Sequence, residues 1–189
     1  MFKQLLPFLL LTLFCEAGHS QQPNKTKETV DRDLAMIKYV PYGQYLSKDW
    51  KQDERENKEY RKKNKYYHEL LKLDTLAIPY LIDRISDTTE MNIRIPCSAH
   101  YLKLGDVAFA VLNDIITVPW HAVTNGQWDA YTCDTLPDDG WDYIYNHRRQ
   151  FQRQLRTFFQ SPKGKIWIRI QKKRLSNAER DALLKKIDE

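Results

Sequence analysis

The segment from Leu102 to Ile116, LKLGDVAFAVLNDII, places apolar residues around most of the circumference of a helix. Spacings of three and four residues between apolar positions predict an α-helix. Because the apolar face is so broad, this helix must be buried between neighbours rather than lie on a surface. We therefore expect an all-α, or mainly α-helical, fold built around such helices. The positions that form the apolar face are Val107, Ala108, Val111, Leu112, Ile115 and Ile116.

Other parts of the chain predict further helices. A short helix is expected within residues 28–40, a charged one within 48–73 and a strongly amphipathic one within 136–159. Ser176 and Glu179 have the spacing of a capping box ahead of a last helix. Residues 165–170, KIWIRI, alternate and are β-branched, so they predict a possible short strand.

Residues 73–89, LDTLAIPYLIDRISDTT, resemble one unit of the HEAT-like α-helical repeat class: a helix ends near Leu73 and a second opens with Pro79 in its first turn. The segment 102–116, with Gly105-Asp106 before its apolar run, resembles the second helix of another unit. With the apolar leader described next, these segments also resemble uncharacterised exported proteins of Gram-negative bacteria. The resemblance implies a compact array of helix pairs with one long aromatic loop, and an exported location. It implies no particular activity.

The first twenty residues have the pattern of a signal peptide. Lys3 precedes the apolar run Leu5–Phe14, which is too short to span a bilayer as a stable helix. Cleavage after Ser20 would leave a periplasmic or secreted protein. A lipid anchor at Cys15 and an uncleaved leader are the alternatives. We expect residues 1–20 to be the leader, 21–29 a disordered tail and 30–189 a single α-helical domain.

Export places the remaining cysteines, Cys97 and Cys133, in an oxidising compartment, where such a pair tends to form a disulfide. The bridge would close a loop of 35 intervening residues, which stabilises a fold by about 3–4 kcal/mol on the chain-entropy model. Unpaired thiols are one alternative. A zinc site is another, because His100 and His121 would complete a Cys₂His₂ set. The disulfide is the favoured prediction, and we expect no cofactor.

Residues 116–134, ITVPWHAVTNGQWDAYTCD, concentrate chemically versatile side chains. We predict that Asn125-Gly126 makes a turn here and that the aromatic residues Trp120 and Trp128 close a helical core. A platform that stacks a sugar or a peptide is the alternative role for these aromatic residues. This segment is the first place to look for binding.

A hydrolase is the rival interpretation of the same segment. His121 would act as general base, with Asp106 or Asp129 orienting it and Asn125 stabilising an oxyanion. The sequence contains no G-x-S-x-G, H-E-x-x-H, P-loop or Rossmann glycine pattern. An enzyme is therefore the less favoured class.

Charge divides along the chain. From Asp74 to Asn146 there are eleven acidic and three basic residues, whereas from His147 to the end there are four acidic and thirteen basic ones. The simpler interpretation is that the two parts face each other. The alternative is an anion-binding face on the helix within 136–159, formed by Arg148, Arg149, Arg153 and Arg156.

Together these features predict a non-enzymatic exported binding module, with an inhibitor or immunity protein as one concrete form. Its partner is expected to be another protein or an anionic envelope component. Nucleic acid is not an expected partner, since no binding motif supports it. Membrane contact is expected only through an uncleaved leader.

Overall fold

Helices dominate the computed structural model, which describes residues 21–38, 40, 65–94, 101–126, 140–173 and 176–188. In those ranges 77% of the residues are helical, and the remaining regular structure is one small two-stranded sheet. The mainly α-helical fold class is therefore confirmed. The predicted leader, Cys97, His100 and Cys133 lie outside the described residues.

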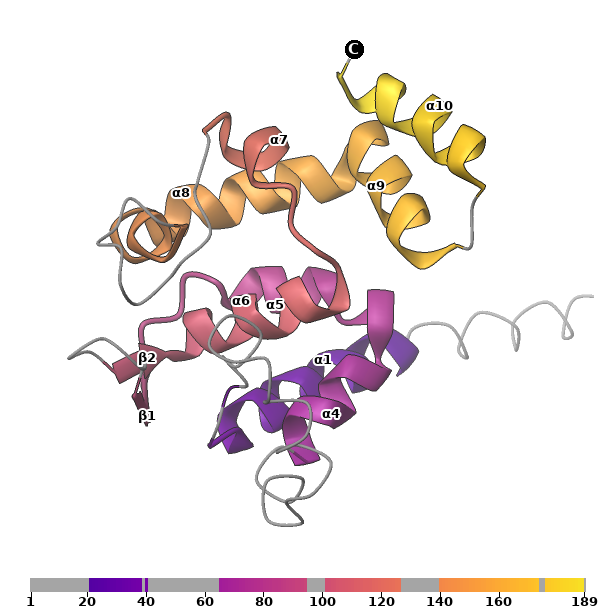
Figure 1. The fold of residues 1–189 in the computed structure, drawn as a ribbon. Helices are drawn as coiled ribbons and strands as arrows, with labels where there is room; N and C mark the ends of the chain where they lie inside the picture. Colours follow the sequence, from indigo (N-terminus) through magenta and orange to yellow (C-terminus); the bar gives the residue numbers. More distant parts are fainter. Residues whose placement is uncertain are drawn as a thin grey trace, which may run out of the picture.

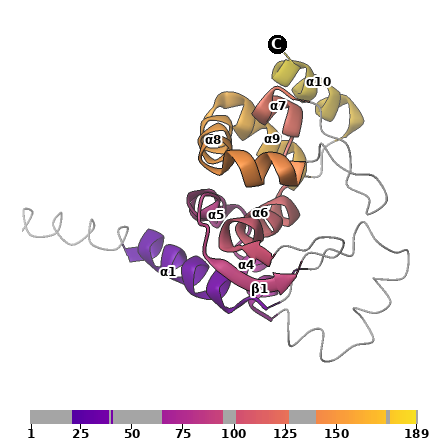
Figure 2. The ribbon, with the colours of Figure 1, turned by 90° about the vertical axis from the view of Figure 1, so that its left-hand side faces the viewer.

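The helices form two layers, which Figures 1 and 2 show from two directions. The first layer contains helices from the middle of the chain and one from its beginning. The second contains the C-terminal helices. The first layer holds α1 (Gln21–Met36), α4 (Lys65–Lys72), the 3₁₀ helix η2 (Asp74–Leu76), α5 (Ile78–Arg84) and α6 (Leu104–Ile115); the second holds α7 (Trp120–Thr124), α8 (Gly140–Gln160), α9 (Pro162–Lys172) and α10 (Asn177–Asp188).

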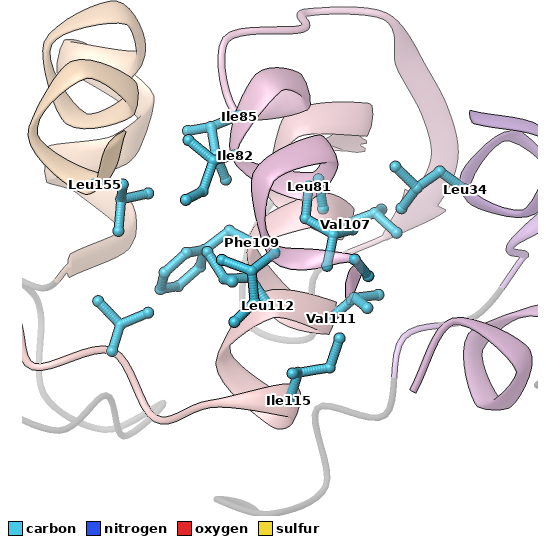
Figure 3. Close-up of a cluster of buried hydrophobic side chains, with 14 of the residues drawn as sticks. Leu34, Leu81, Ile82, Ile85, Val107, Phe109, Val111, Leu112, Ile115 and Leu155 are labelled. Atoms are coloured by element: carbon cyan, nitrogen blue, oxygen red, sulfur yellow. The ribbon is translucent and has the colours of Figure 1, made fainter. Parts of the chain in front are cut away.

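Helix α6 has the buried position that its broad apolar face predicts. It packs against α5, α4 and α1 within its own layer. In the close-up of the core, Leu155 of α8 approaches α5 and α6 from one side and Leu34 of α1 from the other (Figure 3). Both side chains are fully buried. The apolar side chains of α5 and α6 therefore join the two layers through one core.

Gly105 allows the start of α6 to approach the end of α5. Its N–H donates to the Asp87 carbonyl oxygen at 3.0 Å. A Cβ built on Gly105 would meet the Ile85 carbonyl oxygen and lie 2.9 Å from that of Asp87. Only glycine fits this contact without a shift of backbone.

A short antiparallel hairpin lies between α5 and α6, and the sequence analysis did not predict it. Strand β1 (Glu90–Arg94) pairs with β2 (Tyr101–Lys103), with Glu90 opposite Lys103 and Arg94 opposite Tyr101. The register shifts between these two pairs, and Asn92 in β1 has a φ of 48°. A residue in this left-handed conformation is typical of a bulge.

The predicted strand at residues 165–170 is wrong, because these residues belong to α9. Ser161 caps this helix by accepting the Gly164 N–H at 3.1 Å, and Pro162 occupies its first turn. The alternation in KIWIRI suits a strand, but a strand needs a partner for its backbone groups whereas a helix satisfies them internally. The N-cap residue Ser161 and Pro162 in the first turn therefore favour a helix at these residues.

The predicted disordered tail at residues 21–29 is also helical, since α1 begins at Gln21. Val30 and Leu34 in the C-terminal half of α1, and Ile37 directly after it, are buried in the core. Once these residues fix the helix, each further turn toward the N-terminus adds backbone hydrogen bonds without a new nucleation cost.

The predicted capping box at the start of α10 is confirmed. The Ser176 N–H and hydroxyl donate to Glu179 Oε2 at 2.9 and 2.7 Å, and the Glu179 N–H lies 3.3 Å from Ser176 Oγ. The hydrogen bonds from the Ser176 hydroxyl and backbone lower the pKa of the Glu179 carboxyl below its usual value.

This capping box predicts an acid-sensitive α10. Because the Glu179 pKa is lower in the folded than in the unfolded chain, the carboxylate contributes stability above its unfolded pKa, and the contribution is lost as the pH falls through its folded pKa. We expect the α10 amides to lose protection from hydrogen exchange below about pH 4, relative to the intrinsic rates. Glu179→Gln should remove this pH dependence. Equal pH profiles for the two proteins would contradict the prediction.

Candidate functional site

Three ion pairs connect the acidic and basic parts of the chain. Arg148 pairs with Asp106, Arg156 with Asp83 at 2.6 Å, and Lys172 with Asp74 at 2.5 Å. Each pair joins α8 or α9 of the second layer to α6, α5 or η2 of the first. The two parts therefore face each other, and these three cations of the second layer are neutralised at the layer interface.

The Arg148–Asp106 pair is buried, with side-chain exposures of 8% and 7%. Arg148 Nη1 lies 2.7 Å from Asp106 Oδ1, and Nη2 donates to Oδ2 at 3.0 Å. Asp106 Oδ2 also accepts the Lys103 N–H at 2.7 Å, so the same carboxylate caps α6. The expectation that Arg148 lies on an exposed basic face is thus wrong, because Arg148 is buried against Asp106.

A kink in α8 accompanies this pair. His147 has φ −130° and ψ 29°, which is outside the helical region, and it immediately precedes Arg148. The buried face of this amphipathic helix includes Ile144, Phe151 and Leu155, which are fully buried, whereas Tyr145 is 55% exposed.

Residues 120–124 form the short helix α7, where the sequence analysis expected part of a long loop. The Trp120 ring stacks on Phe151 at 5.1 Å between centroids and 13° between planes. It meets Phe109 edge-on at 5.3 Å. Trp120 therefore closes the core, as the first interpretation of the aromatic residues predicted, while Trp128 lies outside the described residues.

Asn125 ends α7 in the left-handed conformation, with φ 58° and its N–H donating to the His121 carbonyl oxygen at 2.8 Å. The predicted turn is therefore present as a helix C-cap, a position at which asparagine is tolerated. His121 is exposed on α7, and Asp129 lies outside the described residues. Arg148 lies against both Asp106 oxygens, and the Lys103 N–H donates to one of them. Asp106 is consequently unsuited to orienting His121.

An open groove of about 570 Å³ lies between α7 and α8 and reaches the start of α9. Its size is in the usual range of ligand sites. It contains two cationic side chains, four neutral hydrogen-bonding ones and three apolar ones, and none of its lining residues is acidic. We call it the α7–α8 groove; it is lined by Ala122, Val123, Gln150, Arg153, Gln154, Thr157, Phe158, Ser161 and Lys163.

Arg153 supplies the exposed charge of this groove. It has no ion-pair partner among the residues that the structure describes. Lys163, which also lines the groove, donates from Nζ to the Ile187 carbonyl oxygen at 2.6 Å, so its ammonium group already has one partner. The Tyr143 hydroxyl donates a hydrogen bond to Gln154 Oε1 at 2.8 Å. The amide NH₂ of Gln154 therefore remains available to donate.

The structure thus separates the four predicted arginines. Arg153 lines the groove, Arg149 is exposed on α8 but does not line it, and Arg148 and Arg156 pair with acidic residues. Gln150, Gln154 and Thr157 were not among the binding residues predicted from the sequence. Gln150 and Thr157 lie three and four residues from Arg153 and so on the same helix face, and Gln154 adjoins Arg153; this spacing was the available signal.

A second cavity, of about 430 Å³, lies between α5 and the α8–α9 corner. Its lining is largely apolar and includes Ile78, Ile82 and Phe159. The charged residues in its wall, Asp83 and Arg156, neutralise each other. It therefore offers a ligand no net charge, in contrast to the α7–α8 groove.

Neither a metal cluster nor a membrane span is found within the described ranges. No group of three or more His, Cys, Asp or Glu side chains there is placed to hold a metal ion. None of the helices in that part of the chain is long and apolar enough to cross a bilayer. The predicted zinc ligands Cys97, His100 and Cys133 lie outside these ranges.

The comparisons with known proteins identify no relative: no family model, no curated protein and no solved structure matches this chain. The resemblance to HEAT-like repeats and to exported proteins therefore stays a prediction.

Proposed function

We propose that this chain is a non-enzymatic binding module that holds an anionic partner in the α7–α8 groove. The observation that carries the proposal is the sorting of charge at the second layer. Arg148, Arg156 and Lys172 are neutralised by acidic residues, whereas Arg153 stands unpaired, within the described residues, in a groove with no acidic lining residue. An unpaired guanidinium beside neutral hydrogen-bonding groups is suited to an incoming carboxylate or phosphate.

The pattern of the first twenty residues supports an exported, periplasmic or secreted setting for this module. Inhibition of an enzyme or toxin that exposes an acidic segment is one concrete form of the function. A hydrolase centred on His121 is the weaker candidate, because the carboxylate of Asp106 is committed to Arg148 and to the α6 N-terminus.

The proposal predicts that Arg153→Gln weakens binding of an anionic probe by about tenfold, the usual effect of losing a hydrogen bond to a charged group. Titration of the full chain with poly-L-glutamate and with polyphosphate at about 0.15 M ionic strength, where the Debye length is about 8 Å, measures this. Arg149→Gln is the matched control, since it removes the same charge from an exposed position of the same helix outside the groove. Its effect should stay below about twofold, since charge outside the contact is largely screened. Equal losses in both variants would show general attraction to a basic surface instead.

A further inference from the structure

We infer that the occupant of the α7–α8 groove is an acidic peptide segment that also inserts an apolar side chain. This inference rests on the proposed function, since it names the partner of the same site. It follows from the chemistry of the lining residues, which present cationic, amide and apolar groups together.

The cationic groups are few. Arg153 and Lys163 are the two cations in the lining, and Lys163 already donates to the Ile187 carbonyl oxygen. A densely charged polymer gains affinity by contacting many cations at once. Two cations instead suit a ligand with isolated carboxylates, each able to accept hydrogen bonds from one guanidinium or ammonium group.

The amide groups favour a polypeptide backbone. Gln150 and Gln154 both line the groove, and the Tyr143 hydroxyl holds the Gln154 Oε1. Glutamine offers both donors and an acceptor, and a peptide backbone presents the complementary N–H and C=O groups. A phosphate polymer presents acceptors only and offers the Gln150 oxygen no donor.

The apolar groups provide a place for a side chain. Ala122 is exposed on α7, and it lines the groove with Val123 and Phe158, which are largely buried in the core and expose only 8% and 7% of their surface. An inorganic anion buries no apolar surface, so apolar groups beside the cation add nothing to its affinity. A peptide that carries an aliphatic side chain next to a carboxylate binds more tightly, because the aliphatic side chain is removed from water.

Three probes test this inference on the full chain: a short acidic peptide with one central leucine, the same peptide with serine at that position, and polyphosphate of comparable charge. Isothermal titration measures the affinity of each. The leucine peptide should bind about tenfold more tightly than the serine peptide, because the leucine side chain leaves water. Arg153→Gln should weaken the binding of both peptides.

The outcomes separate the two proposals. Equal affinity for the two peptides, or Arg153-dependent binding of polyphosphate alone, would overturn the peptide inference and leave the anion-binding function standing. Binding that does not depend on Arg153 for any probe would overturn both.

A pair of variants on α7 checks the location. Ala122→Glu adds a negative charge inside the groove, and His121→Glu adds one at the neighbouring exposed position, which does not line it. Both positions are exposed on a helix, so both proteins should fold. We expect Ala122→Glu to weaken the binding of the leucine peptide about tenfold and His121→Glu to change that affinity far less. The reverse order would place the peptide elsewhere.

Discussion

Arg148→Met is expected to lower the free energy of unfolding by about 3–5 kcal/mol, because it leaves the Asp106 carboxylate buried without its cation. Arg148 also fixes α8 against α6, so its loss affects the contact between the two layers. Urea unfolding followed by circular dichroism gives the free energy of unfolding directly.

Two control variants distinguish this effect from a general loss of charge. Arg149→Met changes the adjacent, exposed arginine, and its effect should stay within about 0.5 kcal/mol. Arg156→Met breaks the half-exposed pair with Asp83, which should cost about 0–1 kcal/mol. If Arg148→Met lowered the free energy of unfolding as little as these two variants, the Arg148–Asp106 contact would be a solvated pair and not a buried one.

The double variant Asp106→Leu with Arg148→Met tests the cause. Replacing both members of a buried ion pair by apolar side chains removes the desolvation cost of the remaining charge. Most of the lost stability should return. About 1 kcal/mol should stay missing, because Asp106 also accepts the Lys103 N–H at the start of α6.

Local patterns in the sequence predicted those elements whose structure depends on nearby residues. The broad apolar face of α6 and the Ser176–Glu179 capping box are of this kind, and both are confirmed. The hairpin and the helical state of residues 165–170 were missed. In the first case the pairing contains a register shift, with Asn92 in the left-handed conformation, that a regular strand pattern does not indicate; in the second a helix cap at Ser161 outweighs the alternation.

The position of Arg148 shows what the sequence could have revealed about the site. Ile144, Arg148, Phe151 and Leu155 follow one another at intervals of four, three and four, so Arg148 lies on the buried stripe of its own helix. This spacing therefore predicts that Arg148 is buried. It does not predict which residue Arg148 pairs with, because Asp106 is 42 residues away and is brought close by the packing of α8 on α6.

The α7–α8 groove was beyond prediction for the same reason. Arg153 was among the predicted binding residues, but its separation from Arg148 and Arg156 depends on which arginines meet an acidic residue across the layers. Two of the three apolar residues of the groove, Ala122 and Val123, come from α7, in a segment that was expected to be a loop. Tertiary contacts, not helix periodicity, decide which cations remain available to a ligand.

Gly105→Ala is expected to destabilise the protein by about 2–3 kcal/mol, as overpacking does in a close contact. In an ordinary helix this change would have the opposite sign and stabilise by about 0.5–1 kcal/mol. Here the new Cβ would press against the Ile85 carbonyl oxygen, and α6 would have to move away from α5. That movement would also stretch the hydrogen bond from the Gly105 N–H to Asp87.

The sign of the effect makes this a sharp test of the α5–α6 contact. Ala110→Gly, in the same helix at a half-buried position, is the matched control and should cost about 1 kcal/mol through helix propensity alone. Thermal unfolding of the two variants compares them under one condition. A stabilised Gly105→Ala protein would mean that α6 does not approach the α5 backbone closely. The placement of Asp106, the next residue, against Arg148 would then need another explanation, because that close approach sets where α6 begins.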